Sequence, residues 1–397
     1  MSEAIIYTDQ LAEQFAKQVG VDPRPRETIR EIDETGAFIR QPNAFTAPAG
    51  EGPGQWKPES GRYAIYWAVG CNWSNRPVIV RDLLGLQDVI GDQLTSHSGQ
   101  SNVYGHGFAD QPGFRDPATG AYYLSEFYKR ADPNFQGRAT TPTLVDVIEK
   151  KAVNNDYHRM TNYLEVAFRA LQPKDAPDLY PKKFRREIDE FNDWLFPYLN
   201  NTHYRMAFCQ SPEAYNEAFD DHYNSLEKLE KRLSENRFLF GDYVTDSDVR
   251  AFVTLVRWDV SYYKNVGPLK GRIQDHPNIW GYVRELYAIP AFHNNSDVRR
   301  LAVGNQNQND PALFRTYAAR ILPKIDLEAL WADDGKRRAL SRTPDELFLR
   351  HSEYETPEDY YSEISTSIWN SPRWEDRNPR NGVLSVDASV NPLKGKL

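Results

Sequence analysis

An apolar run that leads into a cysteine constrains this chain more than any other feature. The run Tyr-Ala-Ile-Tyr-Trp-Ala-Val ends at Val69, Cys71 follows one glycine later, and residues 74–84 then have helical character. Such a run predicts a buried strand over residues 62–69, so Cys71 lies at a strand-to-helix turn. Backbone N–H groups and the helix dipole favour a thiolate there, which makes Cys71 a candidate nucleophile. A buried structural cysteine is the alternative.

Composition narrows the possible partners and compartments. The chain has 397 residues, a formal net charge of -8 and two cysteines, Cys71 and Cys209. An acidic chain without a basic cluster argues against nucleic-acid binding. Two cysteines cannot form a disulfide framework, and neither a leader segment nor an apolar run of about 18 residues is found. We therefore expect a cytoplasmic protein that binds no membrane, and the lack of zinc-ligand spacing predicts no metal site.

The first half of the chain divides into an arm and a mixed domain. Residues 1–60 are rich in proline and glycine, which predicts an N-terminal arm of extended coil. Residues 61–171 mix strand and helix patterns, with short strands expected at 143–146 and 151–153 and a helix opened by Asp156. Strands mixed with helices in about 110 residues predict a small α/β domain.

The second half of the chain has a helical pattern. Residues 172–300 carry apolar side chains three or four positions apart, which predicts an all-α domain. Ser211 and Thr245 stand where helix caps are expected, and Asp248 completes a capping box with Thr245. Residues 301–397 are predicted to form a C-terminal extension.

Taken together, these motifs resemble a glutathione transferase, with a thioredoxin-like α/β domain followed by an all-α domain. More narrowly, the chain resembles the Xi class, the glutathionyl-hydroquinone reductases, over roughly residues 61–298. The resemblance rests on Thr141-Pro142 before a short strand and on the segments 61–66, 130–138, 240–250, 254–259 and 277–284.

The resemblance assigns roles to residues near the candidate nucleophile. Cys71 matches the nucleophilic cysteine of the family's Cys-Pro-Trp-Ala motif, which reads Cys-Asn-Trp-Ser here and retains Trp73 as a glutathione-binding residue. Pro142 matches a cis-proline that presents the backbone of Thr141 to the peptide part of glutathione. An ordinary proline at a strand edge is the alternative for Pro142.

Further matches concern the two ends of the expected ligand. Asp156 and Tyr157 stand where the family has Glu-Ser, which binds the γ-glutamyl end of glutathione; Asp156 keeps the charge, whereas Tyr157 is a bulky departure. Tyr204 matches a tyrosine of the electrophile pocket, and a core tyrosine is the alternative.

Two expected aromatic side chains are missing or displaced. The family has a tryptophan in the loop after the second strand, where this chain offers Tyr104 or Phe108. It also has a tyrosine after the last helix of the all-α domain, where residues 298–303 contain none.

The resemblance implies an enzyme that reduces glutathionyl-hydroquinone-type conjugates through a mixed disulfide on Cys71. Glutathione would be the co-substrate, a quinone or hydroquinone conjugate the small-molecule partner, and a homodimer the working form. A serine- or tyrosine-type transferase would instead activate glutathione without a covalent intermediate, and Cys71 favours the first mechanism. A non-catalytic relative and a transferase that uses another low-molecular-weight thiol are the alternative functions.

Overall fold

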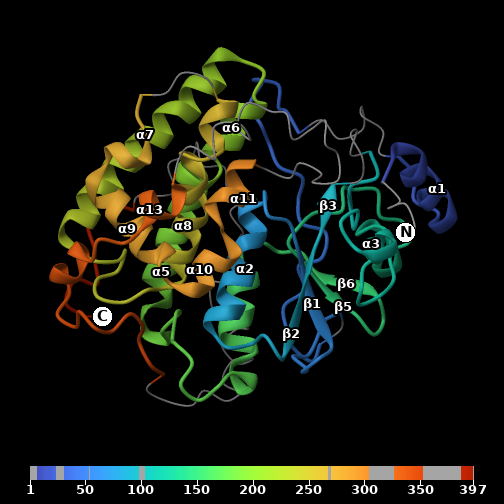
Figure 1. Cartoon of the computed structure of the whole chain (residues 1–397), viewed down its shortest axis with the longest axis horizontal. Coiled ribbons are helices and arrows are strands. Elements are labelled where there is room, and N and C mark those ends of the chain that lie inside the picture. The colour runs from blue at the N-terminus through green and yellow to red at the C-terminus, as the bar shows by residue number, and fades with distance from the viewer. Residues whose placement is uncertain are drawn as a thin grey trace.

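A mixed β-sheet lies beside a bundle of helices in the computed structural model of the chain (Figure 1). The structure describes residues 7–23, 31–52, 54–97, 103–266, 270–303, 326–351 and 386–396. The strands of the sheet are β1 (Tyr63–Trp67), β2 (Ile90–Leu94), β5 (Thr143–Asp146) and β6 (Lys151–Asn154). A second, two-stranded pair is formed by β3 (Ser96–His97) and β4 (His106–Gly107).

The order and direction of the strands are those of a thioredoxin-like sheet. The order is β2-β1-β5-β6, in which β1 is parallel to β2 and antiparallel to β5, and β6 is antiparallel to β5. Three of these strands lie where the sequence predicts them, within a residue or two at the ends. The sequence predicts no strand at β2, because its residues Ile-Gly-Asp-Gln-Leu carry few apolar side chains.

Both faces of the sheet are covered. Helix α2 (Asn72–Leu83) packs on one face and α3 (Ser125–Ala131) on the other. The side chains of β1 alternate between the two sides, so Ile65 enters the larger core with α2 whereas Tyr66 enters the smaller core with α3. All five residues of β1 are buried, and their side chains pack in the cores on both faces of the sheet. This packing fixes the end of β1 and the turn that follows it.

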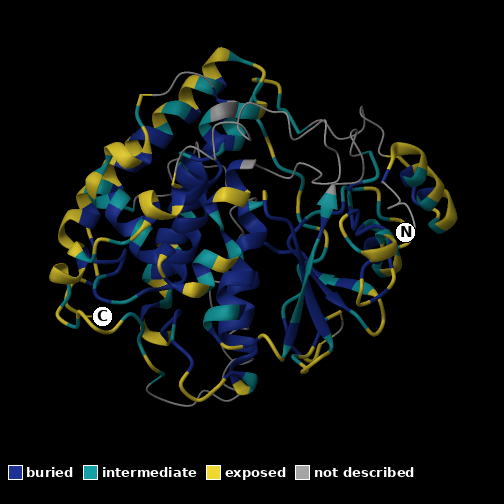
Figure 2. Ribbon diagram, in the orientation of Figure 1, coloured by how far each residue is buried: buried dark blue, intermediate teal, exposed yellow. Residues whose placement is uncertain are grey.

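Helices fill the rest of the main body. Figure 2 shows the central helix, α8 (Asp246–Trp258), in dark blue, and every residue of it is buried. In chain order the helical segments after the sheet are α4 (Met160–Asn162), η2 (Tyr163–Ala167), η3 (Arg169–Leu171), η4 (Lys182–Phe184), α5 (Arg185–Leu195), η5 (Phe196–Asn200), α6 (Thr202–Phe208), α7 (Pro212–Glu235), α8 (Asp246–Trp258), η6 (Tyr262–Asn265), η7 (Ile273–Asp275), α9 (Pro277–Tyr287), α10 (Pro290–Asn295) and α11 (Val298–Val303).

The helix caps expected from the sequence are confirmed. Ser211 Oγ accepts a hydrogen bond from the Ala214 N–H at the start of α7. Thr245 and Asp248 form a capping box at the start of α8, where the Asp248 carboxylate accepts the Thr245 N–H at 2.8 Å. These bonds satisfy N–H groups that a helix leaves unpaired in its first turn.

The prediction of an extended coil for residues 1–60 is wrong in part. Helix α1 (Asp9–Val19) lies within this arm, capped by Thr8 and ended by Gly20 in the left-handed conformation, with φ 68°. Its side chains Ala12 and Ala16 pack on the α3 side of the sheet domain against aromatic rings that include Tyr123. The helix forms because the prolines that dominate the arm begin only after α1 ends.

The C-terminal segments lie against the helical part of the molecule, far from the N-terminal helix (Figure 1). They include α13 (Leu327–Trp331) and the 3-10 helix η10 (Lys336–Leu340). The buried guanidinium of Arg337 donates hydrogen bonds to the carbonyl oxygens of Leu233, Asn236 and Asn278. Much of the predicted extension, 301–397, lies outside the described residues, and the domain limits at 61, 172 and 301 stay predictions.

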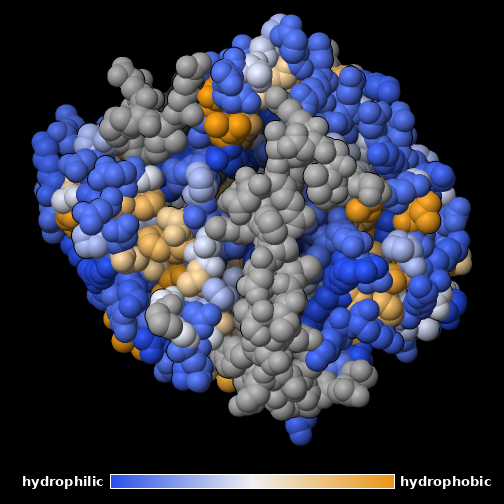
Figure 3. Space-filling view, turned by 180° about the vertical axis from the view of Figure 1, so that it is seen from behind, coloured by the Kyte–Doolittle hydropathy of each residue, from blue (hydrophilic) through white to orange (hydrophobic). Residues whose placement is uncertain are grey.

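The face of the molecule opposite to that of Figure 1 is largely polar where its residues are described. Figure 3 shows a face on which hydrophilic residues surround apolar patches of limited extent. Within the residues that the structure describes, no helix is both long and apolar enough to cross a membrane.

A short 3-10 helix, η1 (Pro112–Phe114), lies between β4 and α3 in the chain.

Candidate functional site

Cys71 lies at the strand-to-helix turn, as the sequence predicts, and occupies the N-cap position of α2, which begins two residues earlier than the predicted residue 74. Its backbone is extended, with φ −89° and ψ 108°, and its carbonyl accepts the Asn75 N–H at 3.2 Å. Ser74 ties the turn together, because its hydroxyl lies 3.1 Å from the carbonyl oxygens of Ala68 and Cys71. Arg257 of α8 fixes the same turn from the helical side by donating to the Val69 carbonyl at 2.8 Å.

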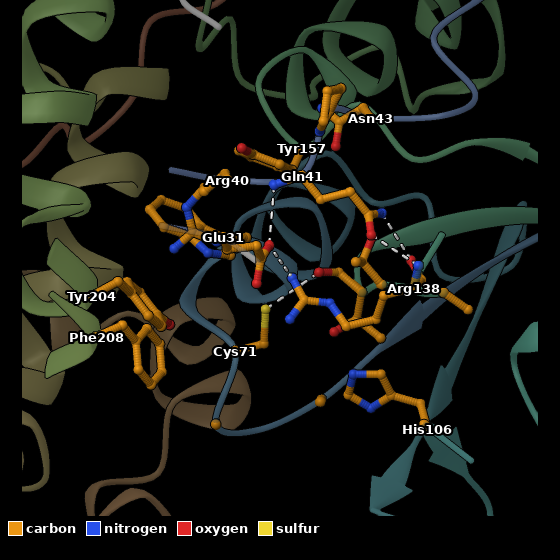
Figure 4. Close-up of a pocket in the computed structure, with 18 of the residues that line it drawn as sticks. Glu31, Arg40, Gln41, Asn43, Cys71, His106, Arg138, Tyr157, Tyr204 and Phe208 are labelled. Carbon is orange, nitrogen blue, oxygen red and sulfur yellow. Dashed lines mark hydrogen bonds and ion pairs between the residues drawn. The ribbon is translucent and has the colours of Figure 1, made fainter. Parts of the chain in front are cut away.

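The peptide bond between Thr141 and Pro142 is cis, which confirms the expectation for Pro142. This turn leads into β5 and places the carbonyl of Thr141 beside the candidate nucleophile. The Cys71 thiol donates to that carbonyl across 3.4 Å (Figure 4). Cys71 and Thr141, which are 70 positions apart in the sequence, therefore form two sides of one site.

A cavity of about 400 Å³ opens above Cys71 (Figure 4). The N-terminal arm, the sheet domain and helix α6 all contribute to its walls. Its lining residues are Glu31, Phe38, Arg40, Gln41, Pro42, Asn43, Ala68, Gly70, Cys71, Trp73, Gly105, His106, Arg138, Ala139, Thr140, Thr141, Tyr157, Tyr204 and Phe208. Of the sequence-predicted site residues, Cys71, Trp73, Thr141, Tyr157 and Tyr204 are thus brought together.

An aromatic cluster supports one wall of the cavity. The Trp73 indole is 4% exposed and packs between the rings of Tyr157 and Tyr204, with centroid distances of 5.5 and 5.6 Å. Phe196 closes the cluster at 5.0 Å from Trp73. Tyr157, the bulky departure from the family pattern, is therefore packed against Trp73 and also lines the cavity.

Tyr204 presents its hydroxyl beside the start of α2. The O–H donates to Asn72 Oδ1 at 3.2 Å, and the Tyr262 hydroxyl lies 3.3 Å from the hydroxyl oxygen of Tyr204. Burial, followed by the nearby Cys71 charge, raises the pKa of Tyr204 above its usual value. The hydroxyl consequently keeps its proton at neutral pH and can act as a hydrogen-bond donor.

Asp156 does not line the cavity. Its side chain is 1% exposed and accepts the His158 N–H at 3.1 Å and the Asn43 amide at 3.5 Å. The prediction that Asp156 opens a helix is wrong, because helix α4 begins at Met160. Asp156 and Tyr157 instead form a turn, in which the Asp156 carbonyl accepts the Met160 N–H at 2.9 Å.

The arm contributes residues that the sequence analysis did not identify. Glu31 accepts a hydrogen bond from the Gln41 N–H at 3.0 Å and forms an ion pair with Arg138 at 2.8 Å. Gln41 also accepts the Arg138 N–H at 2.8 Å. Arg138 stands within the segment 130–138 that carried the resemblance, but no signal in the arm itself marked Glu31 or Arg40.

The displaced aromatics of the loop after β2 do not reach the cavity. Phe108 is buried in the smaller core, and Tyr104 packs against Tyr123. Gly105 and His106 line the cavity instead. Across the described part of the chain, no three His, Cys, Asp or Glu side chains are grouped so that they could hold a metal ion.

Comparisons with known proteins place this geometry in a family. Residues 212–285 match the family described as glutathione S-transferase, C-terminal domain. The glutathionyl-hydroquinone reductase YqjG of Escherichia coli is 36% identical over 270 residues, which are 65% of this chain and 80% of that protein. The glutathionyl-hydroquinone reductase PcpF of Sphingobium chlorophenolicum is 35% identical over 255 residues, 63% of this chain and 79% of that protein.

Solved structures of glutathione transferases are similar to this chain as well. The crystal structure of the glutathione-S-transferase Xi from Phanerochaete chrysosporium aligns with a TM-score of 0.64 and 32% identity, over 72% of this chain and 94% of that one. The glutathione-bound structure of YqjG from Escherichia coli aligns with a TM-score of 0.57 and 30% identity, over 68% of this chain and 88% of that one.

Proposed function

Because the chain belongs to the Xi class of glutathione transferases, the enzyme family that includes the glutathionyl-hydroquinone reductases, we propose that it reduces glutathionyl-hydroquinone-type conjugates with glutathione as co-substrate. The observation that carries this proposal is the position of Cys71, whose Sγ lies at the start of α2, on the cavity wall and 3.4 Å from the Thr141 carbonyl. A thiolate at a helix N-terminus is a competent nucleophile toward sulfur.

The proposed reaction proceeds in two exchanges at sulfur. The Cys71 thiolate attacks the sulfur of the conjugate, the bond from sulfur to the ring carbon breaks, and that carbon takes the electron pair and a proton. Hydroquinone leaves, and a disulfide between Cys71 and glutathione remains. The thiolate of a second glutathione attacks this disulfide, which releases glutathione disulfide and restores the Cys71 thiolate.

The remaining site residues would position the conjugate and its leaving group. In this proposal the backbone of Thr141, next to Pro142, holds the peptide part of glutathione, and Trp73 and Tyr157 pack beside it. Tyr204 would donate its O–H to a ring oxygen of the leaving hydroquinone and stabilise negative charge that develops there.

The cysteines provide the test. We expect Cys71→Ala to abolish reduction of the conjugate and Cys209→Ala to leave it nearly intact, because Cys209 only ends helix α6, where its thiol donates to the Met206 carbonyl at 3.3 Å. Intact-protein mass spectrometry after exposure to the conjugate should find one glutathionyl group on the wild type and none on Cys71→Ala. Equal activity in the two variants would overturn the assignment of the nucleophile.

One observation favours a second candidate, a transferase that uses another low-molecular-weight thiol. Asp156 would bind the γ-glutamyl end of glutathione, yet it is buried behind Asn43 and the cavity wall is formed by Tyr157. Turnover of one hydroquinone conjugated to each of several thiols distinguishes the two candidates. A preference for a conjugate without a γ-glutamyl group would favour this second function.

We also propose that the protein works in the cytoplasm, as its composition predicts, and as a homodimer, as the resemblance to the family implies. Both cysteines are free thiols, as a reducing compartment allows. Light scattering coupled to gel filtration tests the assembly, since a mass of one chain at micromolar concentration would refute the dimer.

A further inference from the structure

We propose that the N-terminal arm completes the cavity with a subsite for an anionic substituent on the aromatic part of the substrate, and that Arg40 is the residue that recognises it. The proposal rests on the proposed function, since it names a further property of the conjugates that Cys71 attacks. It concerns specificity and leaves the chemistry at sulfur unchanged.

The arm is fixed on both sides of the cavity. On the helical side, the Gly36 carbonyl accepts the Gln210 N–H at 2.8 Å, just after α6. On the sheet side, Phe45 and Asn155 exchange two hydrogen bonds of 2.8 Å, just after β6. The residues between these anchors, 38–43, therefore cross the cavity, and Arg40 lies in the middle of this crossing (Figure 4).

The guanidinium of Arg40 is held in place by aromatic rings. Its central carbon lies 4.7 Å from the Trp73 ring centroid, 4.6 Å from that of Tyr204 and 5.3 Å from that of Phe38. Nε donates to Asn201 Oδ1 at 2.8 Å, so one edge of the group is anchored as well. A guanidinium fixed in this way loses little conformational entropy when it binds a ligand.

The same guanidinium retains unused donor capacity. One terminal nitrogen of Arg40, Nη2, is buried and has no hydrogen-bond partner among the described residues. Because Nη2 is closed to solvent, an acceptor on a ligand would reach the guanidinium from the side on which Arg40 lines the cavity, next to Tyr204. A hydrogen bond from a charged donor to such an acceptor favours binding.

Charge indicates what kind of acceptor fits. The two arginines of the cavity differ, because Arg138 is paired with Glu31 at 2.8 Å whereas Arg40 has no carboxylate within ion-pair distance in the described part of the chain. Arg40 is therefore an uncompensated cation in the cavity wall. A planar carboxylate, or another anionic oxygen, matches the fork of donors that a guanidinium presents.

The position of Arg40 indicates which part of the substrate carries the anion. Arg40 lies on the side of Tyr204 and Phe208, whereas Arg138 comes from the opposite side, where Thr141 would hold the peptide part (Figure 4). Phe208, 53% exposed, and Phe38 lie against each other at 5.3 Å and extend an aromatic wall beside Arg40. A substrate ring on this wall would direct an anionic substituent toward Arg40.

A matched pair of substrates tests the subsite. The pair is the glutathionyl conjugate of a carboxylated hydroquinone and that of its neutral methyl ester. We expect wild-type protein to favour the carboxylate in kcat/KM by roughly 10-fold or more, the value of one charge-assisted hydrogen bond. Arg40→Met should abolish this preference, so that kcat/KM becomes about equal for the carboxylate and the ester. Arg40→Lys should retain part of it.

A second arginine variant controls for a general effect of charge. Arg186→Gln removes an equal charge from an exposed site on α5, where the arginine pairs with Glu190, and should keep the preference. An equal loss on both conjugates with a raised KM for glutathione in Arg40→Met would overturn the proposal, because Arg40 would then serve the tripeptide. The absence of any preference in the wild type would overturn it too. If Arg40→Met does not fold, the ratio of kcat/KM for the carboxylate and the ester, measured in the wild type and in Arg40→Lys, tests the subsite.

Failure of the proposed function has a different signature, since neither conjugate would then be reduced. Calorimetric titration with the two free hydroquinones still tests the subsite in that case. Tighter binding of the carboxylated compound to the wild type, lost in Arg40→Met, supports the subsite without turnover, and equal affinities refute it.

Discussion

At the scale of single residues, Tyr204 has one proton and more than one possible acceptor. Its O–H donates to Asn72 Oδ1, which can only accept, and the Tyr262 hydroxyl beside it can either donate to Tyr204 or accept from it. Asn72 stands where the related motif has a proline, and it also donates to Thr254 Oγ1 at 3.3 Å. A substrate oxygen must therefore displace Asn72 before Tyr204 can donate to it.

This competition leads to a prediction for Tyr204→Phe. Loss of a donor aimed at a developing negative charge commonly lowers kcat by roughly 10²-fold, and we expect a decrease of about this size with little change in KM for glutathione. Tyr262→Phe keeps the donor and should have a smaller effect. Steady-state kinetics on one conjugate measures both, and an unchanged kcat in Tyr204→Phe would remove Tyr204 from the mechanism.

The residues next to the cysteine were predictable, and those of the arm were not. Cys71 follows from local sequence, because a strand end and a helix start each have a short-range signature, whereas the cis bond at Pro142 was predicted from the resemblance to the family. Arg40 acts through contacts with Asn201 and Tyr204, which lie more than 160 positions away along the chain. No local pattern encodes such a contact, so a sequence without aligned relatives does not reveal it.

At the scale of elements, helix α8 connects the helical bundle to the nucleophile. Its last turn supplies Arg257, whose guanidinium binds the carbonyls of Val253 and Val69 at 2.7 and 2.8 Å. Val69 ends the segment that leads to Cys71, so a shift of α8 would move the turn. The start of α8 should therefore matter for the site as well as for stability.

The capping box of α8 gives a prediction at this scale. Asp248 accepts hydrogen bonds from the Thr245 N–H and hydroxyl, the Leu239 N–H and the Tyr282 hydroxyl, all between 2.8 and 2.9 Å. Asp248→Ala leaves these buried donors unpaired, and we expect it to lower the free energy of unfolding by roughly 3–5 kcal/mol. Ser211→Ala removes the cap of α7 and the exposed hydrogen bond that the Ser211 hydroxyl donates to the Thr35 carbonyl at 2.8 Å, and should cost about 1–2 kcal/mol.

Urea unfolding of the two variants measures the contrast. Equal losses would show that the Asp248 network contributes no more than an ordinary cap. The sequence predicted both caps, because the capping pattern is local, whereas it missed α1, whose start and end signals, Thr8 and Gly20, surround few strongly apolar side chains.

At the scale of the whole molecule, two histidines are buried in the helical part as neutral rings. His222 is 0% exposed, stacks on Trp258 at 3.6 Å, and its Nδ1 lies 2.9 Å from Thr202 Oγ1. Burial, followed by the charges of His203 and His276, lowers the pKa of His222 to about 3. Burial also lowers the pKa of His203 to about 3, with Arg40 as the second cause.

The pKa of a carboxyl group in the helical part, that of Asp189, is raised rather than lowered. Burial raises the pKa of Asp189 to about 8, and the Tyr180 hydroxyl donates to it. In the folded protein Asp189 therefore keeps a proton that it loses near pH 4 in the unfolded chain. His222 stays unprotonated in the folded protein at pH values below about 6.5, at which the unfolded chain binds a proton there. Such opposed shifts could not be predicted from the sequence, because they depend on how closely the bundle packs around each group.

The raised pKa of Asp189 fixes how a variant at this position responds to pH. Between about pH 4 and pH 8 the contribution of Asp189 to the stability of the wild type falls as the pH rises, because the unfolded chain releases the proton that folded Asp189 retains. Asp189→Asn lacks this dependence, so it should become more stable relative to the wild type from pH 5.5 to pH 7.5. Urea unfolding at the two pH values measures the difference, and a constant difference would contradict the shift.

The lowered pKa of His222 predicts the reverse pH dependence. The unfolded wild type gains a proton at His222 below about pH 6.5 while the folded state does not, so this group costs stability as the pH falls from 6.5 toward 3 and costs nothing above. His222→Gln lacks that cost. Its destabilisation relative to the wild type should therefore shrink by about 1.4 kcal/mol between pH 7.5 and pH 5.5. The same urea experiment applies, and a His222→Gln difference that is equal at pH 5.5 and 7.5 would mean that the imidazole titrates alike in the folded and unfolded states.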